Sequence, residues 1–218
     1  MQARVASIDL DADARPRVQV GTETPEVFDK VVFTGPITAL EPLTAGNRLA
    51  QACRLPDRNI DMQGVVNAAV MLRRGLTPHY WVASIDPEVP FQGIVESTTL
   101  IDRNDTGGVH LVYLMNYLHR TDSRFSRPDD ETLDGYLTGL RRMFPALAQD
   151  DILDARVFRS PFVEPLYSVG YQNRKPPITL VPGRVYLATT AQVYPEVTSW
   201  NGSAGLARKV VDQMIAER

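Results

Sequence analysis

The C-terminal segment, residues 182–218, constrains the fold more than any other part of the sequence. It predicts a short strand over 185–189, a polar loop, and a helix over 201–217 that begins with the small residues Asn-Gly-Ser-Ala-Gly. The first N–H groups of a helix have no partner within it and lie at the positive end of its dipole. We therefore expect this helix N-terminus to face an anion or a carbonyl-rich ligand edge. An ordinary N-capped surface helix is the alternative interpretation.

Three more strands are predicted near the N-terminus, over 4–10, 17–21 and 28–34. The first two alternate polar and apolar side chains around a turn-forming segment. The third contains the continuous apolar run Val31-Val32-Phe33, which is typical of a parallel strand buried on both faces, and it ends at Gly35-Pro36. We expect the strands at the two ends of the chain to belong together, with the middle inserted between them.

The middle of the chain is predicted to form a mixed sheet with one clear helix. Strands are expected over 65–72, 80–84, 93–100, 109–117 and 152–159. The first of these is also compatible with a buried helix. The clear helix is predicted from about Pro128 to Met143, with Ser126 as its N-cap, and a proline-rich ordered loop is expected over 160–183. The predicted fold class is α+β, with α/β remnants at the two ends of the chain.

Composition argues against several functions. A net charge of −3 without a local Lys/Arg cluster argues against nucleic-acid binding. The longest nearly apolar run, Val65 to Leu72, is too short to cross a bilayer, so no membrane span is expected. The single cysteine, Cys53, fits a reducing compartment, and we expect a cytoplasmic location. The three histidines have neither helical i,i+4 pairing nor a nearby cysteine, so no metal site is expected.

Seven segments carry a resemblance to a known family. They are 28–36 (FDKVVFTGP), 63–67 (QGVVN), 78–81 (PHYW), 90–96 (PFQGIVE), 108–114 (GVHLVYL), 140–145 (LRRMFP) and 185–196 (VYLATTAQVYPE). In this order they resemble the flavin-dependent amine oxidase superfamily, in particular its protoporphyrinogen oxidase-like and UDP-galactopyranose mutase-like members. In that superfamily an N-terminal GxGxxG turn binds the FAD pyrophosphate, and a downstream acidic residue binds the ribose. This sequence contains neither feature.

The resemblance implies that the chain is the C-terminal portion of such a protein, in three parts. Residues 1–40 would form a β-meander and strand of the FAD-binding domain, residues 41–180 the substrate-binding domain, and residues 181–218 the C-terminal strand and helix of the FAD-binding domain. The FAD site is then incomplete in this chain alone, and a separate N-terminal FAD-binding polypeptide is expected as a partner. Strands near residues 31 and 187 would lack their usual cover, so we also expect a homodimer or low solubility.

Candidate site residues follow from the residues and the resemblance together. Cofactor contacts are expected at Thr34, Gly35, Pro36, Tyr194, Trp200, Asn201, Gly202 and Ser203. Contacts to a small-molecule substrate are expected at Tyr80, Trp81, Arg159 and Tyr167. Aromatic residues beside apolar ones are also typical of a core, and Arg159 equally fits a surface charge. No general base is assigned, and His110 is expected to be a structural histidine within the sheet.

Three functions stay open at this point. The leading hypothesis is the C-terminal, substrate-binding and flavin-capping part of an FAD-dependent oxidoreductase of the amine oxidase type. It would oxidise a small amine or related substrate once its nucleotide-binding half is supplied, and it would be inactive alone. The alternatives are a mutase-like flavin-dependent isomerase, which the Thr34-Gly35-Pro36 phrase supports, and a truncated domain without catalysis, which the absent GxGxxG turn supports.

Overall fold

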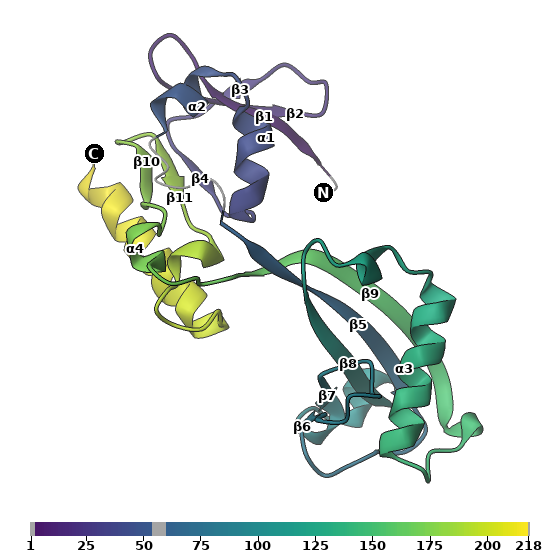
Figure 1. Ribbon diagram of the computed structural model, residues 1–218. Helices are drawn as coiled ribbons and strands as arrows, with labels where there is room; N and C mark the ends of the chain where they lie inside the picture. Colours follow the sequence, from purple (N-terminus) through teal and green to yellow (C-terminus); the bar gives the residue numbers. More distant parts are fainter. Residues whose placement is uncertain (1–2, 54–59, 218) are drawn as a thin grey trace. The chain divides into compact units, whose positions relative to one another are not determined.

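The computed structural model describes residues 3–53 and 60–217, and the chain divides into two compact units (Figure 1). Unit 1 combines Met1–Asp61 with Glu164–Arg218, and unit 2 is the continuous segment Met62–Val163. The two ends of the chain therefore share one unit, with the middle inserted between them, as the strand patterns predict. The predicted boundaries at residues 40 and 180 stay a prediction, because they separate FAD-binding from substrate-binding segments and do not define compact units.

Unit 2 is built on a five-stranded sheet in the order β6-β7-β8-β5-β9. Its strands are β5 (Met62–Leu72), β6 (Trp81–Ala83), β7 (Gly93–Glu96), β8 (His110–His119) and β9 (Ile152–Pro165). The last two residues of β9, Glu164 and Pro165, are assigned to unit 1. Along β5, even-numbered residues are buried and odd-numbered ones are partly or fully exposed. This alternation identifies a strand in a sheet with one covered face, and it excludes the helical alternative for this segment.

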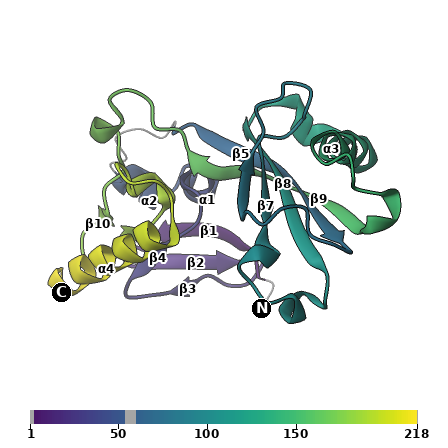
Figure 2. The ribbon, with the colours of Figure 1, turned by 90° about the horizontal axis from the view of Figure 1, so that it is seen from below.

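The covering element is the 15-residue helix α3 (Asp129–Met143) (Figure 2). Tyr136 and Leu140 of α3 belong to the same buried cluster as Val66 and Leu114 of the sheet. The Tyr136 hydroxyl donates a hydrogen bond of 3.1 Å to the backbone carbonyl of Val66. This bond satisfies the one polar group that Tyr136 brings into the core.

Three details of unit 2 differ from the sequence prediction. Strand β7 stops at Glu96, because a 3₁₀ turn over Ser97–Thr99 follows it. The N-cap of α3 is Pro128 rather than Ser126, which lies in a 3₁₀ turn of its own. Strand β9 runs on to Pro165, and its position at the edge of the sheet explains how it accommodates proline.

Unit 1 contains two three-stranded sheets, β1-β2-β3 and β10-β11-β4. The strands are β1 (Val5–Leu10), β2 (Pro16–Val20), β3 (Glu26–Val27), β4 (Val31–Phe33), β10 (Thr179–Val181) and β11 (Val185–Leu187). The helices are α1 (Leu40–Thr44), α2 (Arg48–Ala52) and α4 (Trp200–Ala216). Strands β4 and β11 pair in parallel, so the prediction of a meander that leads into a parallel strand is confirmed. Burial of β4 on both faces is wrong, because Val32 is 36% exposed.

The 17-residue helix α4 packs on the second of these sheets through one face. Leu206 and Val210 share a buried cluster with Tyr186 of β11. At its C-terminal end the Glu217 carboxylate accepts hydrogen bonds from the Gly183 backbone (3.1 Å) and the Thr179 hydroxyl (2.8 Å). These bonds, with the Gly183 N–H first among them, lower the pKa of Glu217 to about 2. The carboxylate therefore ties the end of α4 to β10 and the turn that follows it.

Candidate functional site

The first candidate surface lies in unit 1, where the parallel strands β4 and β11 end. Thr34 and Pro36 are exposed directly after β4, and the Ala188 N–H donates to the Phe33 carbonyl at 2.9 Å. In open parallel sheets, ligands bind outside the carboxyl ends of the strands. Gly35 has a local role as well, because a Cβ there would lie 2.9 Å from the Phe33 ring. Thr34 and Pro36 are thus the exposed residues at this edge, although the Pro36 carbonyl already accepts from the Ala39 N–H at 2.8 Å.

The start of α4 is the second feature of this surface. Ser199 is the N-cap: its hydroxyl accepts from the Gly202 N–H at 3.0 Å, and its carbonyl accepts from the Ser203 N–H at 2.9 Å. Cofactor contacts are expected at the four residues 200–203. The backbone N–H groups of two of them, Gly202 and Ser203, are thus used within the chain. Among the hydrogen bonds of the described residues, none engages the N–H of Trp200 or Asn201. The positive end of α4 therefore keeps two free donors.

Gly202 has a packing role that the sequence did not reveal. A Cβ at this position would lie 2.8 Å from Cγ1 of Val193, so glycine lets α4 approach the turn before it. Gly205, one turn further on, has nothing within 4 Å of an added Cβ. The small residues at the start of α4 thus do not share one purpose, and only Gly202 is required by the packing.

Three tyrosines hold the loop that leads into α4. The rings of Tyr167 and Tyr194 lie 5.1 Å apart, and both contact Tyr171, at 4.7 and 5.3 Å. Hydroxyl groups fix the loop backbone: Tyr171 donates to the Ala191 carbonyl at 2.7 Å, and Tyr167 donates to the Thr190 carbonyl at 3.2 Å. Burial raises the pKa of Tyr167. Tyr167, predicted as a substrate contact, thus lies beside the cofactor candidate Tyr194.

The other predicted substrate residues belong to unit 2. Tyr80 is 45% exposed and Trp81, in the edge strand β6, is 48% exposed. Arg159 is held at the start of α3, where it forms an ion pair with Asp129 and donates to the Thr132 hydroxyl at 3.1 Å. The guanidinium is therefore engaged on the helix-covered side of the sheet. Whether any of these residues contacts substrate stays a prediction.

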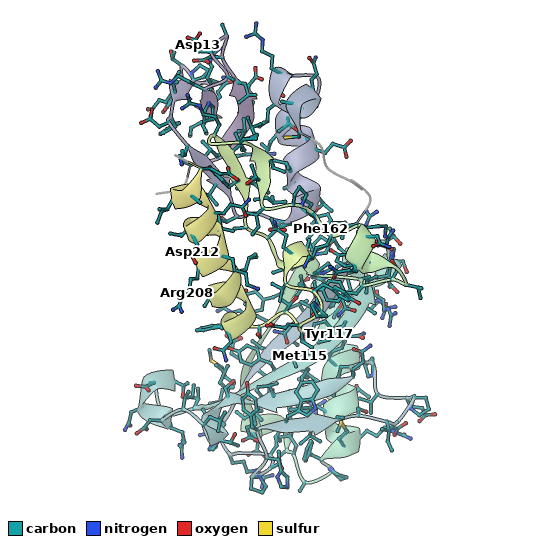
Figure 3. The ribbon with its side chains drawn as sticks, turned by 90° about the vertical axis from the view of Figure 1, so that its left-hand side faces the viewer. Asp13, Met115, Tyr117, Phe162, Arg208 and Asp212 are labelled. Carbon is teal, nitrogen blue, oxygen red and sulfur yellow. The ribbon has the colours of Figure 1, made fainter. Side chains whose placement is uncertain are left out.

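The sheet of unit 2 has a second face, which sequence reasoning missed as a candidate site. Its residues are those opposite in alternation to the buried ones, namely Val65, Asn67, Ala69 and Met71 of β5, Leu111, Tyr113, Met115 and Tyr117 of β8, and Arg156, Phe158 and Phe162 of β9 (Figure 3). We call this set the open sheet face. Phe158 is 56% exposed and Phe162 is 41% exposed. The sequence of β8, HLVYLMNYLH, is largely apolar on both faces, so no polar-apolar alternation distinguishes these residues.

One polar atom on the open sheet face lacks a partner. The side-chain oxygen of Asn67 is buried without a hydrogen bond, and Asn67 pairs across the ladder with Met115. A buried acceptor without a donor is costly, which makes it a candidate contact for a ligand group. The face thus combines apolar and aromatic side chains with the ion-paired Arg156 and one buried acceptor without a partner, the Asn67 side-chain oxygen.

Glu96 and His110 lie apart from this face and serve the structure. Glu96 is 1% exposed and accepts from the Leu76 N–H at 3.2 Å and the Thr77 N–H at 3.0 Å. His110 Nδ1 lies 3.5 Å from the Glu96 carboxylate. The pair anchors the loop around residue 76, in agreement with the expectation that His110 is structural. Among the described residues there is no group of three or more His, Cys, Asp or Glu that could hold a metal ion.

Comparison with known families assigns the chain. A family profile described as flavin containing amine oxidoreductase matches residues 1–199. The chain belongs to the flavin-containing amine oxidoreductase family. Membership in this family implies a flavin cofactor, and it agrees with the resemblance drawn from the seven sequence segments. No curated protein matches the sequence. None of the helices in the described residues is long and apolar enough to cross a membrane.

Several solved structures share the fold of this chain at low sequence identity. A protein provisionally named protoporphyrinogen oxidase from Exiguobacterium sp. 255-15 aligns over 98% of this chain and 47% of its own, with 16% identity and a TM-score of 0.72. Reduced UDP-galactopyranose mutase aligns over 96% and 46%, with 15% identity and a TM-score of 0.68. An oxidoreductase from Methanosarcina mazei aligns over 96% and 49%, with 14% identity and a TM-score of 0.66. The chain spans about half the length of these proteins.

Proposed function

We propose that this chain is the substrate-binding and flavin-capping part of an FAD-dependent oxidoreductase of the amine oxidase type. It would oxidise a small amine or related substrate when a GxGxxG-bearing polypeptide supplies the nucleotide-binding half. The observation that carries the proposal is the family match over residues 1–199 in a chain without a GxGxxG motif. Strand β4 pairs with β11 on one side and forms the edge of its sheet on the other, and we expect that polypeptide to pair with this outer edge.

The residues of unit 1 fit a flavin. When bound, the flavin accepts two electrons from the substrate, and negative charge develops at its N1/C2=O edge. The free N–H groups of Trp200 and Asn201 lie at the positive end of α4, whose first turn contains no acidic residue. Donors in this position stabilise such a charge by about 0.3–1 kcal/mol. The exposed backbone at Thr34–Pro36 is the expected contact for the nucleotide part of FAD.

The residues of unit 2 fit an apolar amine substrate better than a nucleotide sugar. Recognition of a diphosphate uses arginine or lysine. Alternation places one arginine on the open sheet face, Arg156 of β9, and its guanidinium pairs with Asp154 at 3.2 Å. Arg159 is engaged at the start of α3. This composition favours the oxidoreductase over a mutase-like isomerase. Surrounding apolar side chains would exclude water from the reacting bond.

Reconstitution tests the proposal. The chain should be colourless when purified alone and should give a yellow complex when co-expressed with a GxGxxG-bearing N-terminal polypeptide of the same family. Anaerobic addition of benzylamine should then bleach the flavin absorbance. A complex that retains no flavin would contradict the oxidoreductase, and interconversion of UDP-galactose isomers without bleaching would favour the isomerase. A chain that never pairs with such a polypeptide would favour a domain without catalysis.

A single N–H group can be removed to test the flavin contact. Ser199 already has an extended backbone (φ −151°, ψ 165°), so Trp200→Pro fits the first helical position and deletes only one donor and the indole. Trp200→Ala removes the indole alone and is the matched control. We expect Trp200→Pro to raise the dissociation constant of FAD in the reconstituted complex about two- to fivefold over Trp200→Ala. Equal affinities would remove α4 from the flavin site.

A further inference from the structure

Unit 1 contains a cleft of about 220 Å³ along the side of α4. We call it the α4 cleft. Its lining includes the apolar side chains of Ile178, Val193 and Leu206. It also includes the charged side chains of Lys175, Lys209 and Glu196. Neither Trp200 nor Asn201, the two residues with free N–H groups, lines it. The cleft thus excludes the two free N–H donors assigned to the flavin, while two other expected cofactor contacts, Tyr194 and Gly202, line it.

Hydrogen bonds hold the walls of the α4 cleft in place. Gln192 is 6% exposed; its amide donates to the Pro177 carbonyl at 2.9 Å and accepts from the Thr189 N–H at 2.8 Å. Lys175 Nζ donates to the Tyr194 carbonyl at 3.3 Å. These bonds connect the two loops that face α4. A cleft whose walls are already fixed loses little conformational entropy when a ligand enters.

The charges around the cleft favour an anion. Two lysines and one glutamate give a net charge of one positive unit. An ammonium group has three donors, so Lys175 keeps two after its bond to Tyr194. The apolar lining would contact the aliphatic part of a ligand. The cleft volume of about 220 Å³ corresponds to that of about seven water molecules in the liquid. These features describe a short aliphatic molecule with one negative charge.

We propose that the α4 cleft binds a small aliphatic monocarboxylate. Its carboxylate would lie between Lys175 and Lys209, and its chain would lie on Ile178, Val193 and Leu206. The site needs no flavin and no second polypeptide, so it stands or falls independently of the oxidoreductase proposal. A regulator or a product of the host reaction with this chemistry would be its natural occupant.

Titration with hexanoate, followed by amide NMR of the isolated chain, tests the site. We expect saturable shifts at residues 175–178, 192–196 and 202–209 at millimolar concentrations, and no saturation with hexanamide, which has the same body without the charge. Lys209→Gln should weaken hexanoate binding about tenfold. The adjacent Arg208→Gln removes the same charge from an exposed position of α4 and should leave the affinity unchanged.

A second variant tests the space rather than the charge. Gly205 lines the cleft and an added Cβ meets nothing within 4 Å, so Gly205→Leu is compatible with α4 and would occupy the cleft. It should abolish the hexanoate shifts while the remaining spectrum stays folded. Equal binding of hexanoate and hexanamide would overturn the proposal. So would an equal loss in Arg208→Gln and Lys209→Gln, or unchanged binding in Gly205→Leu.

Discussion

The two long helices compensate the positive ends of their dipoles differently. α3 begins with three acidic residues, Asp129, Asp130 and Glu131. α4 has no acidic residue in its first turn, and its second helical residue is Asn201. Carboxylates at a helix start stabilise it by about 0.3–1 kcal/mol. The positive end of α3 is therefore neutralised by its own first turn. α4 has no acidic residue there, and the nearby carboxylate is that of Glu196, which precedes the helix and lies 3.6 Å from the position of a Cβ on Gly202.

The C-terminal ends repeat the contrast. α3 carries Arg141 and Arg142 in its last turn, where cations stabilise the helix, and α4 carries no basic residue there. Instead Lys30, which directly precedes β4, donates to the Met214 carbonyl at 2.6 Å. A helix that supplies its own end charges is stable by local means. One that depends on distant groups at one end, and has free N–H groups and no acidic residue in its first turn at the other, is the better candidate for binding.

Truncating one core side chain of each helix tests whether the two units unfold independently. Leu140 of α3 is fully buried, and we expect Leu140→Ala to lower the free energy of unfolding by about 2–5 kcal/mol. Leu206 of α4 is 9% exposed and belongs to a smaller cluster, so Leu206→Ala should fall at the lower end of that range. Hydrogen exchange should report each loss in its own unit. Equal loss of protection in both units would mean that they unfold together.

The glycines separate close packing from helix propensity. Gly139→Ala in α3 would place a Cβ 2.7 Å from the Pro90 ring, and Gly202→Ala in α4 meets a similar clash. We expect each to cost about 1–3 kcal/mol. Gly135→Ala and Gly205→Ala meet nothing within 4 Å and should raise stability by about 0.4–1 kcal/mol. Urea unfolding measures all four, and a destabilising Gly205→Ala would contradict an open side on α4.

Much of the fold was predictable where a pattern is local. The strands predicted over 65–72 and 109–117 match β5 and β8, and the acidic start and apolar stripe placed α3 within one residue of its observed first residue, Asp129. The predicted N-cap of α3 and the predicted end of β7 were wrong, because short 3₁₀ turns form at both places instead of the regular elements. The exposure of Val32 depends on what covers β4, and three residues of sequence contain no such information.

The candidate site was less predictable, because its properties depend on partners distant in the sequence. The small-residue start of α4 indicated free N–H groups, yet the Ser199 side chain and carbonyl use two of them. Arg159 looked available until its partner Asp129 was known. The open sheet face was missed because both faces of β5 and β8 are largely apolar in sequence, so the pattern does not say which face lacks cover.

Removing the distant cation tests the compensation of α4. Lys30 Nζ also bonds the Glu217 carbonyl at 3.3 Å and lies 5.6 Å from the centre of the Tyr186 ring. Lys30→Met keeps the aliphatic stem and removes the charge, and should cost about 1–2 kcal/mol. The loss should appear as faster amide exchange in the last turn of α4. Faster exchange in α3 instead would show that the effect is not local to this helix end.

The smallest expected effect comes from exchanging the second residues of the two helices. Asn201→Asp gives α4 the charge that α3 has, and Asp130→Asn removes it from α3, both with almost unchanged shape. We expect the first to raise stability by about 0.3–1 kcal/mol and the second to lower it by a similar amount, measured by urea unfolding at low salt.

The affinity for FAD then tests whether the free N–H groups at the start of α4 have a function. If α4 keeps this end free to stabilise the anionic edge of a flavin, Asn201→Asp should raise stability and weaken FAD binding in the reconstituted complex, because the new carboxylate competes for the same N–H groups. Asp130→Asn should leave FAD affinity unchanged. A gain in stability from Asn201→Asp with no loss of FAD would mean that the bare helix end has no functional role.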